Sequence, residues 1–387
     1  MDATKQPDLV IIGGGMAGST AATLAARQGI QTVLIDRWQT YPECFKAEKI
    51  ESDQAVLLRK FELMDCVLPH TGSIREILRA QSGRVIRRVA TEQYGIFYHD
   101  MVNAIRSTLP PAAEFKVGRV QDIQTSSDRQ VVTLASGEVY TPRLVALAAG
   151  TGTGIGQQLG LKRRMIQKEQ SFAAGFNVQR TDGKPFDFDS ITYFPEGSES
   201  RIAFLTLFWI GSIMRANLFA CWSNSEERTR DFVKQPMAEM LRWLPELQNV
   251  SGPLEISGKM ETGRVDLYQA EDMLRDGLVL IGDAYQSVCP VTGTGLSKVL
   301  TDVDVLVHDC LPKWLSSPGM GQHKIAGFYK NSRKQKVDRH SLAGAAYARS
   351  MATNESVAWQ ARRIHRNIDD RISQTLAYFS FNRRATA

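Results

Sequence analysis

The chain has 387 residues, of which 43% are hydrophobic and 23% are charged, and it includes 5 cysteines. This length allows two or three domains with ordinary cores, and the composition excludes a largely disordered or fibrous protein. The cysteines, at positions 44, 66, 221, 289 and 310, form no CxxC pair. Cysteines without such spacing favour a reducing compartment, so we expect a cytoplasmic protein.

The net charge of +6 is concentrated near the C-terminus. Residues 318–387 carry 13 Lys and Arg against 4 Asp and Glu, a net charge of +9, which leaves −3 for residues 1–317. The larger part of the chain therefore gives no reason to expect nucleic-acid binding. The sequence shows neither an apolar run long enough to span a bilayer nor the positive start and apolar core of a signal peptide.

The first predicted elements are a strand, a glycine-rich turn, a helix and a second strand. Residues Asp8–Ile12 form an apolar run typical of a buried parallel strand, and Ser19–Gln28 reads as an Ala-rich helix. A second strand is expected over Thr32–Ile35, with Asp36 at its C-terminal end.

The turn after the first strand has the GxGxxG pattern of a dinucleotide-binding site. Gly13 permits the tight turn, Gly15 lets the backbone approach a pyrophosphate, and Gly18 lets helix and strand pack closely. The helix N-terminus then faces the phosphates, and Asp36, 21 residues after Gly15, can accept hydrogen bonds from a ribose. The pattern predicts a dinucleotide site without choosing between NAD and FAD.

The middle of the chain predicts a helix, one further parallel strand and then a series of β-strands. The helix is expected over Asp100–Leu109, after Tyr98 and His99, and the parallel strand over Leu144–Leu147. The later strands are expected over Ser171–Val178, Ser190–Phe194, Arg201–Phe208 and Ile213–Ser223, with a turn at Pro195–Ser198 and the end of a short helix at Met240–Pro245.

A second glycine motif follows the apolar strand Leu278–Gly282. Asp283, at the end of this strand, can bind the sugar-like chain of a cofactor. A Pro/Gly turn over residues 290–295 then points the next helix, which continues to about Leu306, at another polar edge of the ligand. A helix N-terminus in that place could stabilise negative charge developing on a reduced flavin.

Together the two motifs resemble those of the FAD-dependent aromatic hydroxylases of the p-hydroxybenzoate hydroxylase type, which are related to flavin halogenases and geranylgeranyl reductases. The order and separation of the motifs also fit this superfamily. The resemblance implies an α/β fold with a Rossmann-like FAD-binding domain of the glutathione-reductase type. It further implies an inserted α+β substrate domain, whose antiparallel sheet roofs the flavin, and C-terminal helices.

The resemblance also implies domain boundaries and a set of cofactor-binding residues. The FAD-binding domain is expected over residues 1–72, 99–168 and 269–315, the substrate domain over 73–98 and 169–268, and a C-terminal helical region over 316–387. The residues expected to bind FAD are Gly13, Gly15, Met16, Ala17, Gly18, Asp36, Arg37, Lys46, Val120, Gly282, Asp283, Pro290, Thr292, Gly293, Gly295 and Leu296.

The implied function is that of an FAD-dependent monooxygenase. Such an enzyme hydroxylates an aromatic or conjugated small molecule through a flavin C4a-hydroperoxide, in specialised metabolism or aromatic catabolism. Its co-substrate is O2 and its reductant is NADPH or NADH, acting directly or through a flavin reductase. We expect a monomer or homodimer without a transmembrane segment.

Two departures from the family pattern leave alternatives open. The strand Leu144–Leu147 is not followed by the Asp-Gly pair associated with NAD(P)H handling. The family's usual Arg at the start of the earlier helix Asp100–Leu109 is also absent, and Tyr98 and His99 precede that helix instead. An FAD-dependent reductase of prenyl or alkene double bonds and a non-catalytic flavoprotein acting through a partner are the alternatives. A halogenase-like flavoenzyme is less favoured, because the Trp-x-Trp signature is missing and the nearest string contains Trp209 alone.

Four residues are candidates for catalysis or substrate binding: Arg264, His99, Arg215 and Tyr193. Arg264 stands where the family has a functional Arg, and His99 could take the place of the missing flavin-contacting Arg or cap the helix. The others could line an aromatic pocket with Trp209 and Trp222, in which Arg215 would hold an anionic group. The interpretation that we favour is that the aromatics are ordinary sheet residues and that Arg215 is solvated. The six His show no metal-ligand spacing, so no metal site is predicted.

The C-terminal segment predicts a basic amphipathic helix. Apolar residues recur there at helical spacing among arginines: Ile364, Ile368, Ile372, Leu376 and Phe379. Docking of this helix on the FAD domain is the simpler interpretation, and binding to an acidic partner or an anionic lipid surface is the alternative.

Overall fold

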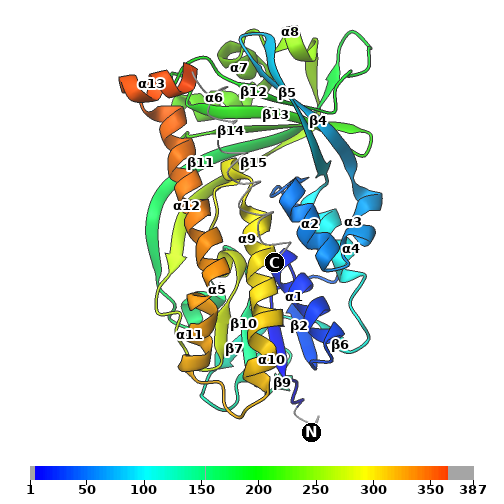
Figure 1. Cartoon of the computed structure of the whole chain (residues 1–387), viewed down its shortest axis with the longest axis vertical. Helices are drawn as coiled ribbons and strands as arrows, with labels where there is room; N and C mark the ends of the chain where they lie inside the picture. Colours follow the sequence, from blue (N-terminus) through cyan, green and yellow to red (C-terminus); the bar gives the residue numbers. More distant parts are fainter. Residues whose placement is uncertain (1–4, 153, 365–387) are drawn as a thin grey trace, which may run out of the picture. The chain divides into compact units, whose positions relative to one another are not determined.

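The computed structural model describes residues 5–152 and 154–364 of the chain, which forms two compact units (Figure 1). Unit 1 consists of Met1–Ser73, Gln93–Gln170 and Gly263–Ala345. Unit 2 consists of Ile74–Glu92, Ser171–Thr262 and Ala346–Ala387. Each unit is therefore assembled from segments that are separated along the sequence by parts of the other.

Unit 1 is built on a five-stranded parallel sheet with the strand order β16-β10-β1-β2-β6. The strands are β1 (Leu9–Ile12), β2 (Thr32–Asp36), β6 (Ala113–Val117), β10 (Leu144–Leu147) and β16 (Leu278–Leu280). Four of them are the continuous apolar runs that predicted parallel strands, and those predictions are confirmed. Their side chains are buried almost throughout, as a sheet covered on both faces requires.

Helices and a small second sheet complete unit 1. The helices are α1 (Met16–Arg27), α2 (Ser52–Lys60), α3 (Met64–Val67), α4 (Tyr98–Arg106), α5 (Gly154–Gln158), α9 (Gly295–Asp304), α10 (Leu311–Leu315) and α11 (Gln322–Lys330), with a π-helical segment over Val305–Cys310. The small sheet contains β7 (Val120–Gln124), β8 (Val131–Leu134) and β9 (Val139–Tyr140). Helix α1 contacts both α4 and α9, and its Ala, Gly, Ser and Thr side chains let these elements approach closely.

Two helix starts in unit 1 differ from the sequence-based prediction. Helix α1 begins at Met16 instead of Ser19, because Gly15 is in extended conformation and serves as its N-cap. Helix α4 begins at Tyr98 instead of Asp100, because the amide of Met101 donates to the carbonyl of Phe97 and closes the first turn two residues earlier. The suggested role of His99 as a residue capping this helix from outside is therefore wrong, since His99 lies within the first turn.

Unit 2 is built on a curled sheet in the order β15-β11-β14-β13-β12-β4-β5. The strands are β4 (Gly72–Gln81), β5 (Arg84–Gly95), β11 (Arg163–Arg180), β12 (Ser190–Phe194), β13 (Ile202–Ile210), β14 (Ile213–Ala220) and β15 (Leu254–Ala270), and the ends of β4, β5, β11 and β15 extend into unit 1. Within unit 1, the end of β5 pairs with β3 (Lys49–Ile50).

The predicted antiparallel character of this sheet is wrong at one place. Strands β12 and β4 run parallel, with Ser190 opposite Ile77, whereas β11, β14, β13 and β12 are joined by antiparallel pairs. A parallel pair needs a long connection instead of a hairpin, and the chain between β4 and β12 includes β5 and a large part of unit 1. The sheet is therefore mixed.

Aromatic side chains and short helices fill the core of unit 2. Trp222 is fully buried, 5.6 Å from the ring of Phe172 and 5.4 Å from that of Phe232. The helices are α6 (Glu227–Lys234), α7 (Pro236–Trp243) and α8 (Gln248–Ser251). The long α12 (Ser332–Thr353) begins in unit 1 and ends in unit 2, and α13 (Val357–Ile364) follows it.

The C-terminal predictions are covered in part by the structure. Helix α11 ends at Lys330, because Asn331 has an extended conformation before α12 starts. The predicted amphipathic helix lies outside the described residues beyond Ile364. Among the residues that the structure describes, no helix is long and apolar enough to cross a membrane.

Candidate functional site

Chemistry-bearing side chains of unit 1 gather where neighbouring parallel strands end. The glycine turn follows β1, Asp36 closes β2, and Asp283 comes just after β16. Because parallel strands present their carboxyl ends at one edge, these groups share that edge of the sheet. Ligands of open α/β sheets bind at such an edge, which makes it the candidate site of unit 1.

Two glycines of the first turn are required by close backbone contacts. Gly13 has φ +104°, and a Cβ atom there would stand 2.6 Å from the carbonyl oxygen of Ala148. A Cβ atom on Gly18 would stand 1.8 Å from the carbonyl oxygen of Gly13. A side chain at Gly13 would push the turn away from the backbone after β10, and one at Gly18 would push α1 away from the turn. The packing that the pattern predicted for Gly18 is therefore confirmed.

The carboxylate of Asp36 is fixed by the turn that it faces. Its Oδ2 accepts a hydrogen bond of 2.5 Å from the amide of Gly14, and its Oδ1 accepts one of 2.9 Å from Trp38. The guanidinium of Arg106 lies 3.4 Å from the same carboxylate. Each carboxylate oxygen can accept more than one hydrogen bond, so Asp36 keeps acceptor capacity for ligand hydroxyls.

Arg106 is a residue of this site that the sequence analysis missed. It is buried at the end of α4, where Nη2 donates to the carbonyl of Gly14 over 2.6 Å and Nη1 donates to that of Trp38 over 2.7 Å. It therefore joins the glycine turn to the segment that follows Asp36. One signal was available: Arg106 lies four residues after the buried Val102, on the apolar stripe of its helix.

Two tyrosines that the sequence did not indicate, Tyr41 and Tyr98, lie next to Gly15 and contact the predicted Lys46; we call these three residues the tyrosine–lysine cluster. The hydroxyl of Tyr98 accepts a hydrogen bond of 3.2 Å from the amide of Met16, at the start of α1. Lys46 donates to the hydroxyl of Tyr41 over 3.2 Å and lies 5.0 Å from the centre of the Tyr98 ring. Burial raises the pKa of Tyr98, so its hydroxyl stays protonated at neutral pH and can donate a hydrogen bond to a ligand.

Tyr98→Phe is expected to weaken the binding of anionic ligands at this turn about fivefold, because one hydrogen bond of about 1 kcal/mol is lost while the ring stays in place. A titration of the purified protein with FAD, followed by fluorescence, measures the change in Kd. Tyr140→Phe is the matched control, since the hydroxyl of Tyr140 donates to Glu138 over 2.7 Å away from the glycine turn. Equal Kd values for the Tyr98→Phe variant and the wild type would contradict the assignment.

The second glycine turn is shaped by left-handed glycines and by contacts to α2. Gly282 has φ +62° and Gly293 has φ +67°. The side-chain amide of Gln54 donates to the carbonyl of Gly293 over 2.8 Å, although 239 residues separate them. Residues Pro290–Thr292 form a 3-10 turn, and α9 starts at Gly295. The expected Pro/Gly turn before a helix is confirmed, and Gln54 is a contact that no sequence pattern indicated.

Asp283 follows this glycine and is partly buried. Burial raises the pKa of its carboxyl group, an effect that the nearby Lys298 and Lys46 oppose. The hydroxyl of Tyr268 donates to the backbone carbonyl of Asp283 over 3.0 Å. The turn thus offers a carboxylate from a rigidly held backbone.

The other residues predicted in unit 1 differ in their exposure. Arg37 is exposed, and Val120 is buried in β7. His99 stacks on Phe97 with ring centres 5.6 Å apart, and its Nδ1 is buried without a hydrogen-bond partner. Arg264 lies on β15, where its exposed guanidinium is 3.4 Å from Glu169. Of these four residues, His99 is the one with an unused buried polar atom.

The candidates of unit 2 are buried in its sheet. Arg215 is 2% exposed, and it donates to Glu261 over 2.7 Å and to Asn177 over 3.1 Å. The expectation that Arg215 is solvated is therefore wrong. The hydroxyl of Tyr193 accepts a hydrogen bond of 3.1 Å from the amide of Gly83.

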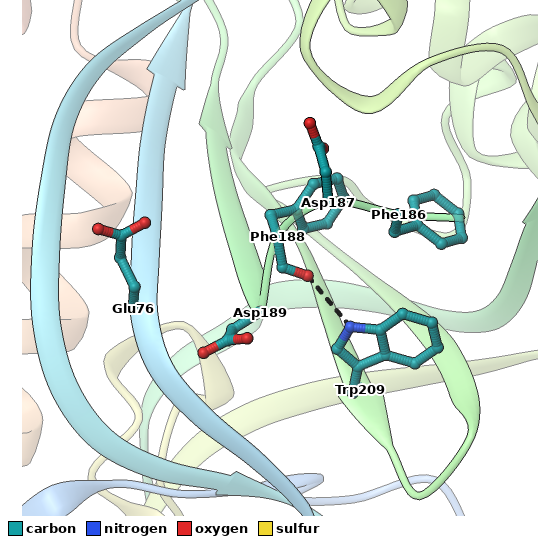
Figure 2. A pocket seen from close by; sticks show the side chains of 6 residues that line it. All are labelled: Glu76, Phe186, Asp187, Phe188, Asp189 and Trp209. Atoms are coloured by element: carbon teal, nitrogen blue, oxygen red, sulfur yellow. Dashed lines mark hydrogen bonds between the residues drawn. The ribbon is translucent and has the colours of Figure 1, made fainter. Parts of the chain in front are cut away.

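Unit 2 also has a pocket that includes one of the predicted aromatic residues (Figure 2). Its lining consists of Glu76, Phe186, Asp187, Phe188, Asp189 and Trp209. The indole Nε1 of Trp209 donates to the carbonyl of Phe188 over 3.1 Å. The lining is acidic as well as aromatic, and Tyr193, Arg215 and Trp222 do not belong to it. The predicted grouping of these three residues with Trp209 around one substrate pocket therefore stays a prediction.

Comparison with known proteins identifies the family to which this chain belongs. Residues 6–309 match the family described as FAD binding domain. The chain belongs to this family of FAD-dependent oxidoreductases. The resemblance to the FAD-dependent hydroxylase superfamily is thereby confirmed, and the α/β fold with its FAD-binding domain agrees with it.

The chain is also similar to two curated proteins and to one solved structure. It is 24% identical to the 3-demethoxyubiquinol 3-hydroxylase of Escherichia coli, over 79% of this chain and 80% of the relative. It is 24% identical to a digeranylgeranylglycerophospholipid reductase of Methanococcus vannielii, over 83% and 80%. The fold matches the crystal structure of p-nitrophenol 4-monooxygenase from Pseudomonas putida with a TM-score of 0.74, 17% identity and 93% coverage of both chains.

Proposed function

We propose that this flavoprotein is a monooxygenase that hydroxylates an aromatic or conjugated small molecule. The observation that carries the proposal is the arrangement of unit 1, in which the glycine turn, Asp36 and Asp283 share one edge of a parallel sheet. The names of two similar proteins, a hydroxylase and a monooxygenase, support the reaction class.

The residues at this edge fit FAD. The bare backbone at Gly13 and Gly18 permits the close approach of turn and helix, and the N-terminus of α1 favours a pyrophosphate. Asp36 would hold the ribose and Asp283 the ribityl chain. The isoalloxazine would lie against the turn formed by Pro290, Thr292, Gly293, Gly295 and Leu296.

The proposed roles of FAD and of the chain's own residues follow from these contacts. FAD, when bound, supplies the activation of O2 and the transfer of one oxygen atom. The chain binds and orients the cofactor, and it excludes water from the reacting groups. His99, Arg264, Arg215 and Tyr193 stay proposals for contacts to flavin or substrate, with His99 offering an unused ring nitrogen.

NADPH or NADH is the proposed source of electrons, directly or through a separate flavin reductase. The external route is favoured by the sequence after β10, where Ala148 and Ala149 stand in place of an Asp-Gly pair. An alternative is the reduction of prenyl or alkene double bonds, which the similarity to the reductase of Methanococcus vannielii favours.

The test begins with the colour of the purified protein, which should be yellow with two visible flavin bands. We then expect oxidation of NADPH or NADH and consumption of O2 with a panel of aromatic compounds, with or without a flavin reductase, and a product heavier by one oxygen atom. Turnover of an alkene without O2 would favour the reductase instead. A colourless protein that does not bind added FAD would contradict both functions.

Asp283→Ala is expected to raise the Kd for FAD about tenfold, because a charge-assisted hydrogen bond is removed. Asp276→Ala is the matched control, since Asp276 lies in the loop before β16 and accepts a hydrogen bond of 2.7 Å from the amide of Gln322 at the start of α11. Similar Kd values for the two variants would contradict the role of Asp283.

A further inference from the structure

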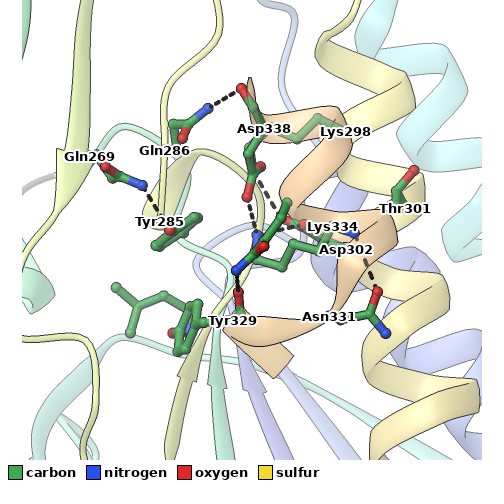
Figure 3. Close-up of polar contacts among 12 residues, drawn as sticks. Gln269, Tyr285, Gln286, Lys298, Thr301, Asp302, Tyr329, Asn331, Lys334 and Asp338 are labelled. Carbon is green, nitrogen blue, oxygen red and sulfur yellow. Dashed lines mark hydrogen bonds and ion pairs between the residues drawn. The ribbon is translucent and has the colours of Figure 1, made fainter. Parts of the chain in front are cut away.

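Four charged side chains are buried behind the second glycine turn (Figure 3). They are Lys298 and Asp302 on α9 and Lys334 and Asp338 on α12, and we call them the buried quartet. In each pair the residues are four apart and therefore on the same side of the helix. The first three are 0% exposed and Asp338 is 7% exposed.

The charges of the buried quartet balance one another. Asp302 is 2.9 Å from Lys298 and 2.8 Å from Lys334, while Asp338 is 3.1 Å from Lys334 and 3.6 Å from Lys298. Burial alone would raise the pKa of Asp302, but the two lysines hold this pKa below its ordinary value. Apolar residues of similar volume often pack as stably as buried ion pairs, so stability alone is a weak explanation for the quartet.

The quartet also holds both peptide groups of Gly282. Asp302 Oδ2 accepts a hydrogen bond of 2.9 Å from the amide of Gly282, and Lys298 Nζ donates to its carbonyl over 3.2 Å. Gly282 is in the left-handed region and directly precedes Asp283. Fixing both peptide groups of one residue fixes the direction in which the next side chain leaves the backbone.

Further contacts make this support rigid. The ammonium of Lys334 lies 4.1 Å from the centre of the Tyr285 ring, and Gln286 donates to the carbonyl of Asp338 over 3.2 Å. The hydroxyl of Tyr329 accepts a hydrogen bond of 2.9 Å from the amide of Leu280 in β16. Helices α9, α11 and α12 therefore all bind the strand and the turn that carry Asp283.

We propose that Lys298 is a positioning residue for FAD: together with Asp302 it locks Gly282, and thereby aims the carboxylate of Asp283 at the ribityl chain. The proposal rests on the proposed role of Asp283 in cofactor binding. Lys334 and Asp338 form the second ion pair of the quartet, while the hydrogen bonds to the peptide groups of Gly282 come from Lys298 and Asp302, so the two halves of the quartet can be separated by mutation.

Two charge-neutral double variants separate positioning from stability. Lys298→Met with Asp338→Asn removes one positive and one negative charge together with the bond to the Gly282 carbonyl. Lys334→Met with Asp338→Asn removes the same charges but keeps Lys298 and Asp302 on Gly282. Each variant keeps one neutral Lys–Asp pair, so the two losses of thermal stability should be similar.

We expect the Lys298 variant to raise the Kd for FAD about tenfold and the Lys334 variant less than about threefold. Amide exchange at residues 282–284 of the apoprotein should be faster in the Lys298 variant alone. An equal rise in Kd in both variants, or equal exchange, would overturn the positioning role.

A measurement on the wild type keeps the proposal refutable if a variant does not fold. The amide of Gly282 should exchange among the slowest in the apoprotein, since it is buried and bonded to Asp302. Rapid exchange there would contradict the proposal. If the wild type does not bind FAD, the proposed function fails, and the exchange data still decide whether Lys298 holds the turn.

Discussion

Gly18→Ala is expected to abolish useful FAD binding and to lower the free energy of unfolding by about 3 kcal/mol. The added Cβ would stand 1.8 Å from the carbonyl oxygen of Gly13, which is backbone and has little freedom to move. Helix α1 must then shift away from the turn that is proposed to bind the pyrophosphate. We expect the Kd to rise at least about a hundredfold, the equivalent of about 2.8 kcal/mol.

Chemical denaturation and a titration with FAD measure the two effects of Gly18→Ala. Gly327→Ala is the matched control, because Gly327 also lies within a helix, α11, and a Cβ atom there would have nothing within 4 Å. This control should gain up to about 1 kcal/mol from helix propensity and leave the Kd unchanged. A Gly18→Ala protein that resembles the control in stability and affinity would show that turn and helix do not need the close contact.

The parallel sheet of unit 1 was predictable because strands that are buried on both faces have continuous runs of apolar residues. Strands β1, β2, β10 and β16 are short runs of apolar residues, and each was found. Strand β6 was missed because its five residues, Ala-Glu-Phe-Lys-Val, are half-buried or exposed and show no continuous apolar run. The sheet of unit 2 was expected to be antiparallel from the family resemblance. The parallel pair of β4 and β12 was missed, because strand patterns do not reveal which distant strands become neighbours.

The two glycine turns were also predictable, because backbone geometry there restricts the residue type. Arg106, Gln54 and Tyr98 were not found, although each binds a glycine turn or the helix that follows it. Their contacts join residues between 82 and 239 positions apart, and ordinary Arg, Gln and Tyr carry no local pattern for such a pairing.

The buried quartet could not be predicted from the sequence either, because its pattern usually indicates exposed residues. Lysines and aspartates four residues apart are common on exposed helix faces, where they contribute little. Only the packing of α9 against α12 shows that Lys298 and Asp302 are fully buried and bonded to Gly282. In this protein, Lys and Asp four residues apart on a helix hold the second glycine turn in place instead of facing solvent.

Arg106→Met is expected to lower the free energy of unfolding by about 3 kcal/mol and to raise the Kd for FAD roughly thirtyfold. The methionine fills much of the space but leaves the buried carbonyl of Gly14 and the partly buried carbonyl of Trp38 without their donor. Asp36 also loses its neighbouring positive charge, 3.4 Å away. Arg106→Lys should recover little, because one ammonium cannot reproduce the several directions in which the guanidinium donates.

Arg143→Met provides the control for losing an arginine that binds carbonyl groups. Arg143 donates to Leu315 over 2.8 Å and to Ser317 over 2.6 Å, in the segment before α11 instead of at the glycine turn. It is partly exposed, so water can replace the lost donor and the stability loss should stay below about 1.5 kcal/mol. The Kd for FAD should not change. If both variants weaken FAD equally, the effect of Arg106 is general destabilisation; if the effect is confined to Arg106, this arginine holds the glycine turn and Asp36 in the geometry that the cofactor needs.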